Sequence, residues 1–280
     1  MAQQFPRSDV KPGSKQVAVV VPVYSSRFTA DEEISLRHLT HFLGANDKFL
    51  VVPQSLEINL QGFQVRRFAD EFFFDTATYS ALLLSSNFYR TFAEYRYILI
   101  YQLDALVFSD QLLSWCETGL DYIGAPWLAG VGLDFVETTT VGNGGFSLRR
   151  TESFLKITES PGFEKELAKY RDAFDAAKPA YMRILNIPRK LVRRVLGRNK
   201  RLRASGSADP GDMLNEDLFW SFRAKKYFPE FRIGSVSEAL RFSFEVAPRQ
   251  CYELNKRQLP FGCHAWTKYD REFWEPFLLK

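Results

Sequence analysis

Residues 97–104 read Tyr-Ile-Leu-Ile-Tyr-Gln-Leu-Asp, an apolar run that ends in two polar side chains, Gln102 and Asp104. A continuous run of large apolar residues is typical of a strand that is buried on both faces, as in a parallel sheet. Ligands of open parallel sheets bind outside the carboxyl ends of the strands. The stretch therefore predicts a buried strand with a polar site at its end.

The residues before this strand alternate between strand and helix patterns. Val17 to Val23 is a second apolar run, and Thr29 followed by Glu32 forms a capping box that starts a helix. Short strands are expected at 49–52 and 63–68, and one helix at 76–92. This alternation predicts an α/β fold with a mixed, mostly parallel sheet and helices on both faces.

Length permits one large domain or two small ones, and composition indicates a folded protein. The chain has 280 residues, of which 46% are hydrophobic and 25% charged, which is ordinary for a globular protein. We expect a disordered lead-in at 1–16 and a single domain at 17–280, with a basic insertion at about 176–212. The three cysteines lack the spacing of a zinc ribbon or a disulfide scaffold, and no signal peptide or membrane-spanning run is visible. A reduced, cytoplasmic protein is expected.

The positive charge of the chain is local. Between Lys178 and Arg203 there are ten lysines and arginines and no acidic residue, although the net charge of the whole chain is only +4. Met182 to Arg203 is compatible with an amphipathic helix on anionic lipid at the inner face of the membrane. A solvated, partly disordered insertion explains it equally well. Nucleic acid is not expected as a partner, because the segment lacks aromatic residues that would stack on bases.

Asp104 is the first candidate for chemistry. A carboxylate at a strand end can hold Mg²⁺ or Mn²⁺, and such a cation neutralises a departing diphosphate. A turn or cap aspartate is the competing interpretation. Gln102 is also expected to bind the ligand that carries the diphosphate. It stands at the position of the first acid in the usual metal-binding signature Asp-x-Asp.

A glycine-rich stretch, Gly142-Asn143-Gly144-Gly145-Phe146, lies within a strand expected at 141–148. Glycines remove side chains where the backbone must approach another group closely or take a positive φ. Gly144 and Gly145 could form the floor under a sugar and donate main-chain N–H groups to it. A β-bulge or hairpin is the alternative. The spacing matches neither a dinucleotide fingerprint nor a P-loop.

Two later motifs add acid–base and metal-binding groups. Glu216 and Asp217 open a helix, where one carboxylate could take a proton from an attacking hydroxyl. An ordinary acidic first turn would look the same. His264 could complete a metal shell or touch a diphosphate, although a lone histidine is often structural.

Three literal stretches carry a family resemblance: Tyr101 to Ala105, Asp121 to Trp127 and Gly142 to Arg149. With them the chain resembles bacterial glycosyltransferases of the GT-A (Rossmann-like) type, in particular an uncharacterised family that contains these motifs. The similarity covers about residues 17–170 and resumes at 213–267. The motif order is also distantly similar to that of Fringe-type β-1,3-glycosyltransferases.

The resemblance implies a nucleotide-sugar donor, usually linked to uridine diphosphate, and a divalent metal. Carried over, Asp104 is the metal ligand and His264 a metal or diphosphate contact. Asp217 is the general base, and Glu216 supports it. The first strand and its loop, through Val21, Pro22 and Tyr24, are expected to hold the nucleotide base.

The expected function is the transfer of a sugar from a nucleotide diphosphate to a hydroxyl of a glycan or glycolipid, with inversion favoured and retention left open. Two alternatives stay open. One is a sugar nucleotidyltransferase, although the loop after the first strand lacks the glycines that this class needs. The other is a carbohydrate-binding protein without catalytic activity.

Overall fold

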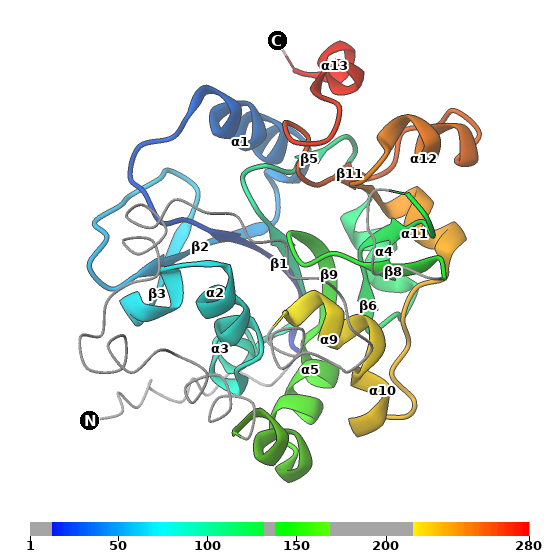
Figure 1. Cartoon of the computed structure of the whole chain (residues 1–280). Helices are drawn as coiled ribbons and strands as arrows, with labels where there is room; N and C mark the ends of the chain where they lie inside the picture. The colour runs from blue at the N-terminus through cyan, green and yellow to red at the C-terminus, as the bar shows by residue number, and fades with distance from the viewer. Residues whose placement is uncertain (1–12, 132–137, 169–214, 280) are drawn as a thin grey trace, which may run out of the picture.

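The computed structural model describes residues 13–131, 138–168 and 215–279. Its centre is a six-stranded sheet with the strand order β3-β2-β1-β4-β9-β6 (Figure 1). In chain order the strands are β1 Lys15–Pro22, β2 Asp47–Pro53, β3 Gln64–Phe68, β4 Tyr95–Tyr101, β6 Tyr122–Ile123 and β9 Phe146–Arg150. Strands β1 to β4 are parallel, β9 is antiparallel to β4, and β6 is antiparallel to β9. The expected mixed, mostly parallel sheet is confirmed.

Strand β1 shows why the sheet needs helices on both faces. Val17, Val19 and Val21 pack into one hydrophobic cluster, whereas Ala18 and Val20 pack into another on the opposite face. Because both sets are buried, each face must be covered. The run also begins at Lys15, so β1 starts two residues earlier than the sequence predicts.

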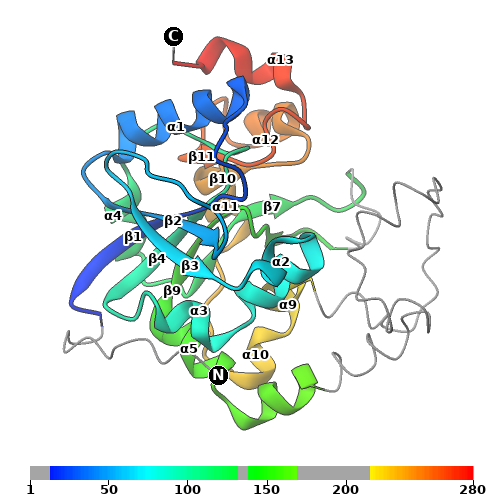
Figure 2. The same ribbon diagram turned by 90° about the vertical axis from the view of Figure 1, so that its left-hand side faces the viewer.

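The helices divide between these two faces (Figure 2). The first face is covered by α1 Ala30–Leu43, α4 Leu112–Glu117 and α11 Val236–Phe242. The second face is covered by α2 Thr76–Leu83, α3 Ser86–Arg90, α5 Thr151–Thr158, α9 Glu216–Phe222 and α10 Ala224–Tyr227. The expected placement of helices on both faces is confirmed.

The prediction of a single helix at 76–92 is wrong. Helix α2 ends at Leu83, and the Ser85 hydroxyl accepts a hydrogen bond from the Phe88 N–H at 3.3 Å, which caps a new helix. Serine is a strong N-cap residue because its oxygen satisfies a free N–H of the first turn. The break lets α3 take its own direction against the sheet.

The strand expected at 141–148 is also two elements. Strand β8 (Thr140–Gly142) pairs with β7 (Ala125–Trp127), whereas β9 belongs to the central sheet. The turn between β8 and β9 contains Asn143, whose φ of 83° is in the left-handed region. Asparagine tolerates this region better than most residues do.

The C-terminal part adds a small sheet over the end of the central one. Its strand order is β10-β11-β5, from Ser243–Phe244, Gly262–Cys263 and Leu106–Val107. The remaining elements are η1 Asp70–Phe73, α12 Pro248–Leu254, α13 Arg271–Trp274 and η3 Glu275–Phe277. This arrangement carries β11, and with it His264, to the loop that follows β4.

The basic insertion expected at about 176–212, its segment Met182 to Arg203 and residues 1–12 of the lead-in lie outside the described residues. None of the described helices combines the length and the apolar character that a membrane span requires.

Candidate functional site

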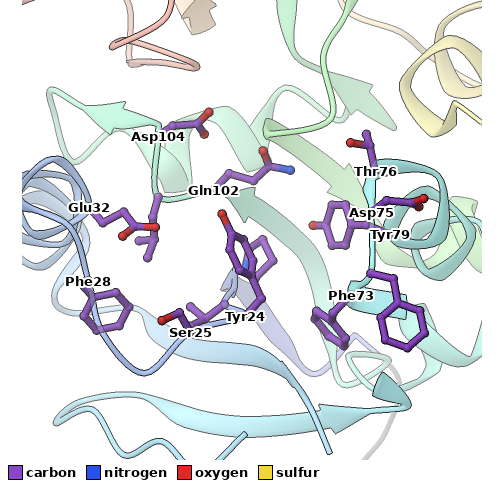
Figure 3. A pocket seen from close by; sticks show the side chains of 14 residues that line it. Tyr24, Ser25, Phe28, Glu32, Phe73, Asp75, Thr76, Tyr79, Gln102 and Asp104 are labelled. Carbon is purple, nitrogen blue, oxygen red and sulfur yellow. The ribbon is translucent and has the colours of Figure 1, made fainter. Parts of the chain in front are cut away.

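A pocket of about 390 Å³ opens at the carboxyl ends of β1 and β4. Residues 22–25 after β1 and residues 102–104 after β4 form its base, and residues 73–76 with Tyr79 form the side toward α2. Figure 3 shows side chains from these segments and from α1 surrounding the space. The pocket thus occupies the edge where open α/β sheets bind their ligands.

One end of the pocket is aromatic. Tyr24 is 70% exposed and, together with Phe28 and Phe73, lines the cavity (Figure 3). Exposed aromatic rings beside a cavity offer stacking surfaces for a planar group. Pro22 lines the same pocket, whereas the Val21 side chain is fully buried in the core and does not. Of the three residues expected around a nucleotide base, two therefore border the cavity.

The polar lining of the pocket is acidic. Its charged side chains are Glu32, Asp75 and Asp104, and no lysine or arginine occurs among the lining residues in the described part of the chain. A phosphate group placed here would face carboxylates, which repel it. An anionic ligand in this pocket therefore requires a cation that these lining side chains do not supply.

His264 contacts two of the residues that line the pocket and lies between two pairs of polar side chains. Its Nε2 is 3.2 Å from Oδ1 of Asp104 and 3.1 Å from Oε1 of Gln102. Its Nδ1 is 2.9 Å from Oε1 of Glu245 and 2.9 Å from the side-chain nitrogen of Asn143. The strand end with Gln102 and Asp104 and the glycine-rich stretch, through Asn143, thus meet at the imidazole ring of His264.

The carboxylates around His264 change its titration. Burial alone would lower the pKa of the imidazole, but the nearby charges of Asp104 and Glu245 raise it to about 10. Burial likewise opposes the charge of both carboxyls, yet contact with His264 lowers the pKa of Asp104 and of Glu245. At neutral pH the bare cluster is therefore a buried cation held by two carboxylates.

The donors in this cluster fit a divalent cation. Asp104 Oδ1 is buried and has no hydrogen-bond partner, although Nε2 of His264 is 3.2 Å away. Neighbouring ligands of an octahedral Mg²⁺, with bonds of about 2.1 Å, are about 3.0 Å apart, close to the separations of Nε2 from Asp104 and Gln102. Glu245 on Nδ1 is the carboxylate partner that metal-binding histidines usually have.

The protein itself offers only a few ligands to the coordination shell of such a cation. Among the described residues, no group of three or more His, Cys, Asp or Glu side chains is placed to hold a metal. Asp104 and His264, with the amide oxygen of Gln102, would leave positions for ligand oxygens. The acidic lining of the pocket supports the same arrangement, since a phosphate there needs a cation.

The glycines of the turn make room for side chains of the protein itself. A Cβ on Gly145 would lie 2.0 Å from Nε2 of His264, and one on Gly144 would lie 1.8 Å from Oε1 of Glu216. The N–H groups of Gly145 and Phe146 donate to Oδ1 of Asn143 at 2.8 and 3.0 Å. The close approach that the sequence predicts is present, but its partners are His264 and Glu216.

Glu216 and Asp217 begin α9 on the other side of this turn. Glu216 is 4% exposed and forms a 3.0 Å ion pair with Arg149, which is fully buried. Burial and the adjacent charge of Glu216 raise the pKa of Asp217 to about 7, and Glu245 contributes in the same direction. Asp217 is therefore a carboxylate that can exchange a proton near neutral pH.

Tyr79 links the two halves of the site. Its side chain lines the pocket together with Gln102 (Figure 3), and both Glu216 and Asp104 affect its titration. Burial, followed by the charge of Glu216, raises the pKa of its phenol. The structure therefore brings the strand end at Gln102 and Asp104, the glycine-rich stretch, the acidic start of α9 and His264 to one edge of the sheet.

Three residues of this site are missing from the sequence-based set. Arg149 is the last residue of the motif Gly142 to Arg149 and directly follows the strand predicted at 141–148, a position that could have drawn attention to it. Glu245 and Tyr79 carry no local signal, since neither belongs to one of the motifs. Only their contacts across the fold identify them.

Comparisons with known proteins give a family and two structural likenesses. A search of curated protein sequences finds no match. The chain matches the apo-form glycosyltransferase GlyE of Streptococcus pneumoniae TIGR4 with 13% identity and a TM-score of 0.43, over 95% of this chain and 61% of that one. It matches the galactosyltransferase LgtC, solved with donor and acceptor sugar analogues, with 11% identity and a TM-score of 0.48, over 94% and 96%.

TM-scores below 0.5 are too low for these similarities to support a conclusion about function. This chain also spans less than two thirds of the GlyE chain. The family match is of a different kind, because it extends over most of the residues that form the site. The model described as "Protein of unknown function (DUF5672)" matches residues 62–264, from the strand β3 to His264. The chain belongs to the DUF5672 family.

Proposed function

We propose that the protein is a glycosyltransferase of the GT-A type, which moves a sugar from a nucleotide diphosphate, expected to be a UDP-sugar, to a hydroxyl of a glycan or glycolipid. One observation carries the proposal: Gln102, Asp104 and His264 meet beside an acidic pocket, and the Gly144–Gly145 turn joins them to the acidic start of α9. Donor binding and proton removal both require groups of these kinds in one place.

The proposed orientation of the donor follows from the lining of the pocket. Its base would lie at the aromatic end, where Tyr24 and Phe28 offer ring faces, and its diphosphate would lie toward Asp104. A divalent cation held by Asp104, His264 and Gln102 would neutralise the charge of the diphosphate as it leaves. The Tyr79 hydroxyl, which reaches the same space, would donate a hydrogen bond to the donor.

Asp217 would act on the acceptor. Its carboxylate takes the proton of the acceptor hydroxyl while that oxygen forms a bond to the anomeric carbon of the sugar. The bond from this carbon to the diphosphate oxygen breaks, and the electron pair leaves with the nucleotide. Attack on the face opposite the leaving group inverts the configuration at this carbon.

The test is a panel of nucleotide sugars, with and without Mn²⁺, in which release of nucleoside diphosphate and transfer to glycan acceptors are measured. We expect turnover of at least one donor, lost in Asp104→Asn and in Asp217→Asn. The matched control is Asp110→Asn, since Asp110 is exposed and outside the pocket. Unchanged turnover in both site variants would refute the assigned roles.

Two further assays separate the alternative functions. Release of pyrophosphate from a nucleoside triphosphate and a sugar phosphate would identify a nucleotidyltransferase. Calorimetric binding of glycans, without any effect of nucleotide or Mn²⁺, would identify a carbohydrate-binding protein.

A further inference from the structure

Arg149, which pairs with Glu216 at the acidic start of α9, has no role in the chemistry described so far, and that chemistry does not explain how Glu216 would support Asp217. Arg149 is fully buried, and each of its three nitrogens is engaged. Nε donates to Ser147 Oγ at 3.0 Å, Nη1 to Tyr89 Oη at 3.0 Å, and Nη2 to Glu216 Oε1 at 3.1 Å. Such a network holds the guanidinium in a single orientation.

The partner of Arg149 is held equally firmly. The Glu216 carboxylate occupies the space where a Cβ on Gly144 would lie, and Nη2 of Arg149 also reaches the Gly144 carbonyl at 3.3 Å. The first residue of α9 is therefore pinned to the turn between β8 and β9. Since Asp217 follows Glu216 directly, the same contacts fix the backbone that carries Asp217.

Removing only one charge of this ion pair would leave the other charge buried without a partner. A buried guanidinium without a counter-ion is strongly unfavourable, so Arg149 depends on its 3.0 Å ion pair with Glu216. Burial opposes the charge of Arg149, but Glu216 raises the pKa of the guanidinium above its ordinary value. Glu216 is thus a fixed negative charge next to Asp217.

Resting on the proposed function, we propose that Arg149 and Glu216 are positioning residues for the general base: their buried ion pair orients Asp217 and keeps a permanent negative charge beside it. A carboxylate next to a fixed negative charge holds its proton more tightly. The base then titrates near the pH at which it works, where proton transfer is most effective.

Other charged and titratable groups around Asp217 are few. Glu245, which follows β10, acts in the same direction as Glu216, whereas Arg149 on β9 opposes it. The Tyr122 phenol on β6 also interacts with Asp217, and the Leu218 N–H donates to its Oδ1 at 2.8 Å. Tyr79 on α2 faces Glu216. Among these charges Glu216 has the largest effect on Asp217, which makes it the one to remove.

The experiment measures the titration of Asp217 without any substrate. A group that titrates near pH 7 in the native state and near 4 when unfolded destabilises the protein as pH rises between these values, and the loss levels off above the native pKa. The difference in unfolding free energy between the wild type and Asp217→Asn, measured from pH 4 to 9, should therefore level off near pH 7.

The same difference is then measured in the double variant Arg149→Met/Glu216→Gln. Replacing both charges keeps the interior neutral, so this variant is expected to fold even where Glu216→Gln alone does not. We expect the level to be reached at a lower pH, by up to about one unit, because the effect of Glu216 on the pKa of Asp217 exceeds the opposing effect of Arg149 and both are gone. The control pair Arg90→Met/Glu159→Gln removes an exposed ion pair on the surface and should leave the titration unchanged.

An unchanged titration in the double variant would overturn the proposal, and so would a shift of the same size in the surface control. The enzyme hypothesis is tested separately, because failure of the wild type to turn over any nucleotide sugar leaves the titration measurable. If turnover is found, the double variant should lower kcat at least tenfold with KM for the donor unchanged. Arg149→Lys, which keeps the charge but loses the fork geometry, should recover part of this loss.

Discussion

Glu216 and Asp217 are adjacent acids with different surroundings. Glu216 is neutralised by Arg149, whereas the nearest charges to Asp217 are mostly negative. Two carboxyl groups of one chemical type can therefore divide the work: one holds a fixed charge and the other exchanges a proton. The same division is found wherever the surroundings of two acids separate their pKa values.

If Asp217 is the general base, its protonation sets the acidic side of the pH profile. The base works only when ionised, so kcat should fall about tenfold per pH unit below its pKa, which burial and Glu216 raise to about 7. Asp217→Asn should lower kcat by about 10² to 10⁴ and abolish this slope. A slope that persists in the variant would assign the titration to another group.

Glu245 is expected to orient His264 for metal binding. Its carboxylate is 2.9 Å from Nδ1, which directs Nε2 toward Asp104 and Gln102. Loss of such a partner typically weakens metal binding about 10- to 100-fold. We expect this loss of Mn²⁺ affinity in Glu245→Ala, measured by calorimetry in the presence of nucleoside diphosphate. Glu253→Ala, an exposed acid on α12, is the control, and equal affinities in the two variants would contradict the role.

At this scale the sequence indicates which residues could do chemistry but not which of them touch. Asp104 and Asp217 stand out because a strand end and a helix start are visible as patterns. The pairs of Arg149 with Glu216 and of His264 with Glu245 join positions that are 67 and 19 residues apart. Such pairs depend on the three-dimensional path of the chain, and no local spacing records them.

Among the elements, the turn between β8 and β9 has the strictest requirement for small residues. Gly145→Ala would place a Cβ 2.0 Å from the His264 ring, which several partners hold in place. Overpacking of this kind costs about 1–3 kcal/mol. We expect that loss in the free energy of unfolding by denaturant titration.

A double-mutant cycle tests the cause of the loss. In a His264→Ala background the same Gly145→Ala change should cost less, because the space is free. Gly162→Ala is the control, since its nearest contact is an ordinary 3.8 Å to Tyr227, and it should not destabilise. An equal cost of Gly145→Ala in both backgrounds would show that the imidazole is not responsible.

The elements also show where sequence patterns fail. Apolar periodicity locates α1, β1 and β4 well, because each is long and has clear ends. It merges α2 with α3 and β8 with β9, where a single polar residue redirects the chain. Ser85 and Asn143 act through one cap and one left-handed φ, and neither effect changes the apolar pattern around it.

For the whole molecule, the predicted class of fold is confirmed because both faces of the central strands are apolar, and only a sheet between two helical layers buries both. The position of the pocket follows from the same layout. The third hydrophobic cluster, which packs β5, β10 and β11 together with α12 and α13, has no such signature in the sequence. Its strands are two residues long, too short for a period to show.

The basic segment Met182 to Arg203 gives a prediction about the whole chain. If it binds anionic lipid, the protein should float with vesicles that contain phosphatidylserine but not with purely zwitterionic ones. Higher salt should release it, because surface charges are screened. A variant in which the arginines of this segment are replaced by glutamine should stay at the bottom of the gradient. Flotation that ignores both lipid charge and this variant would leave the segment without a membrane role.

The contact between Gln102 and His264 joins residues separated by 162 positions. Contacts between such remote positions form late in folding, after a large loop has closed. A nascent chain that has left the ribosome only as far as β9 already holds all six strands of the central sheet but lacks the imidazole. The cluster around His264 can therefore assemble only after residue 264 has been synthesised, so the central sheet of a growing chain would be complete before this cluster could form.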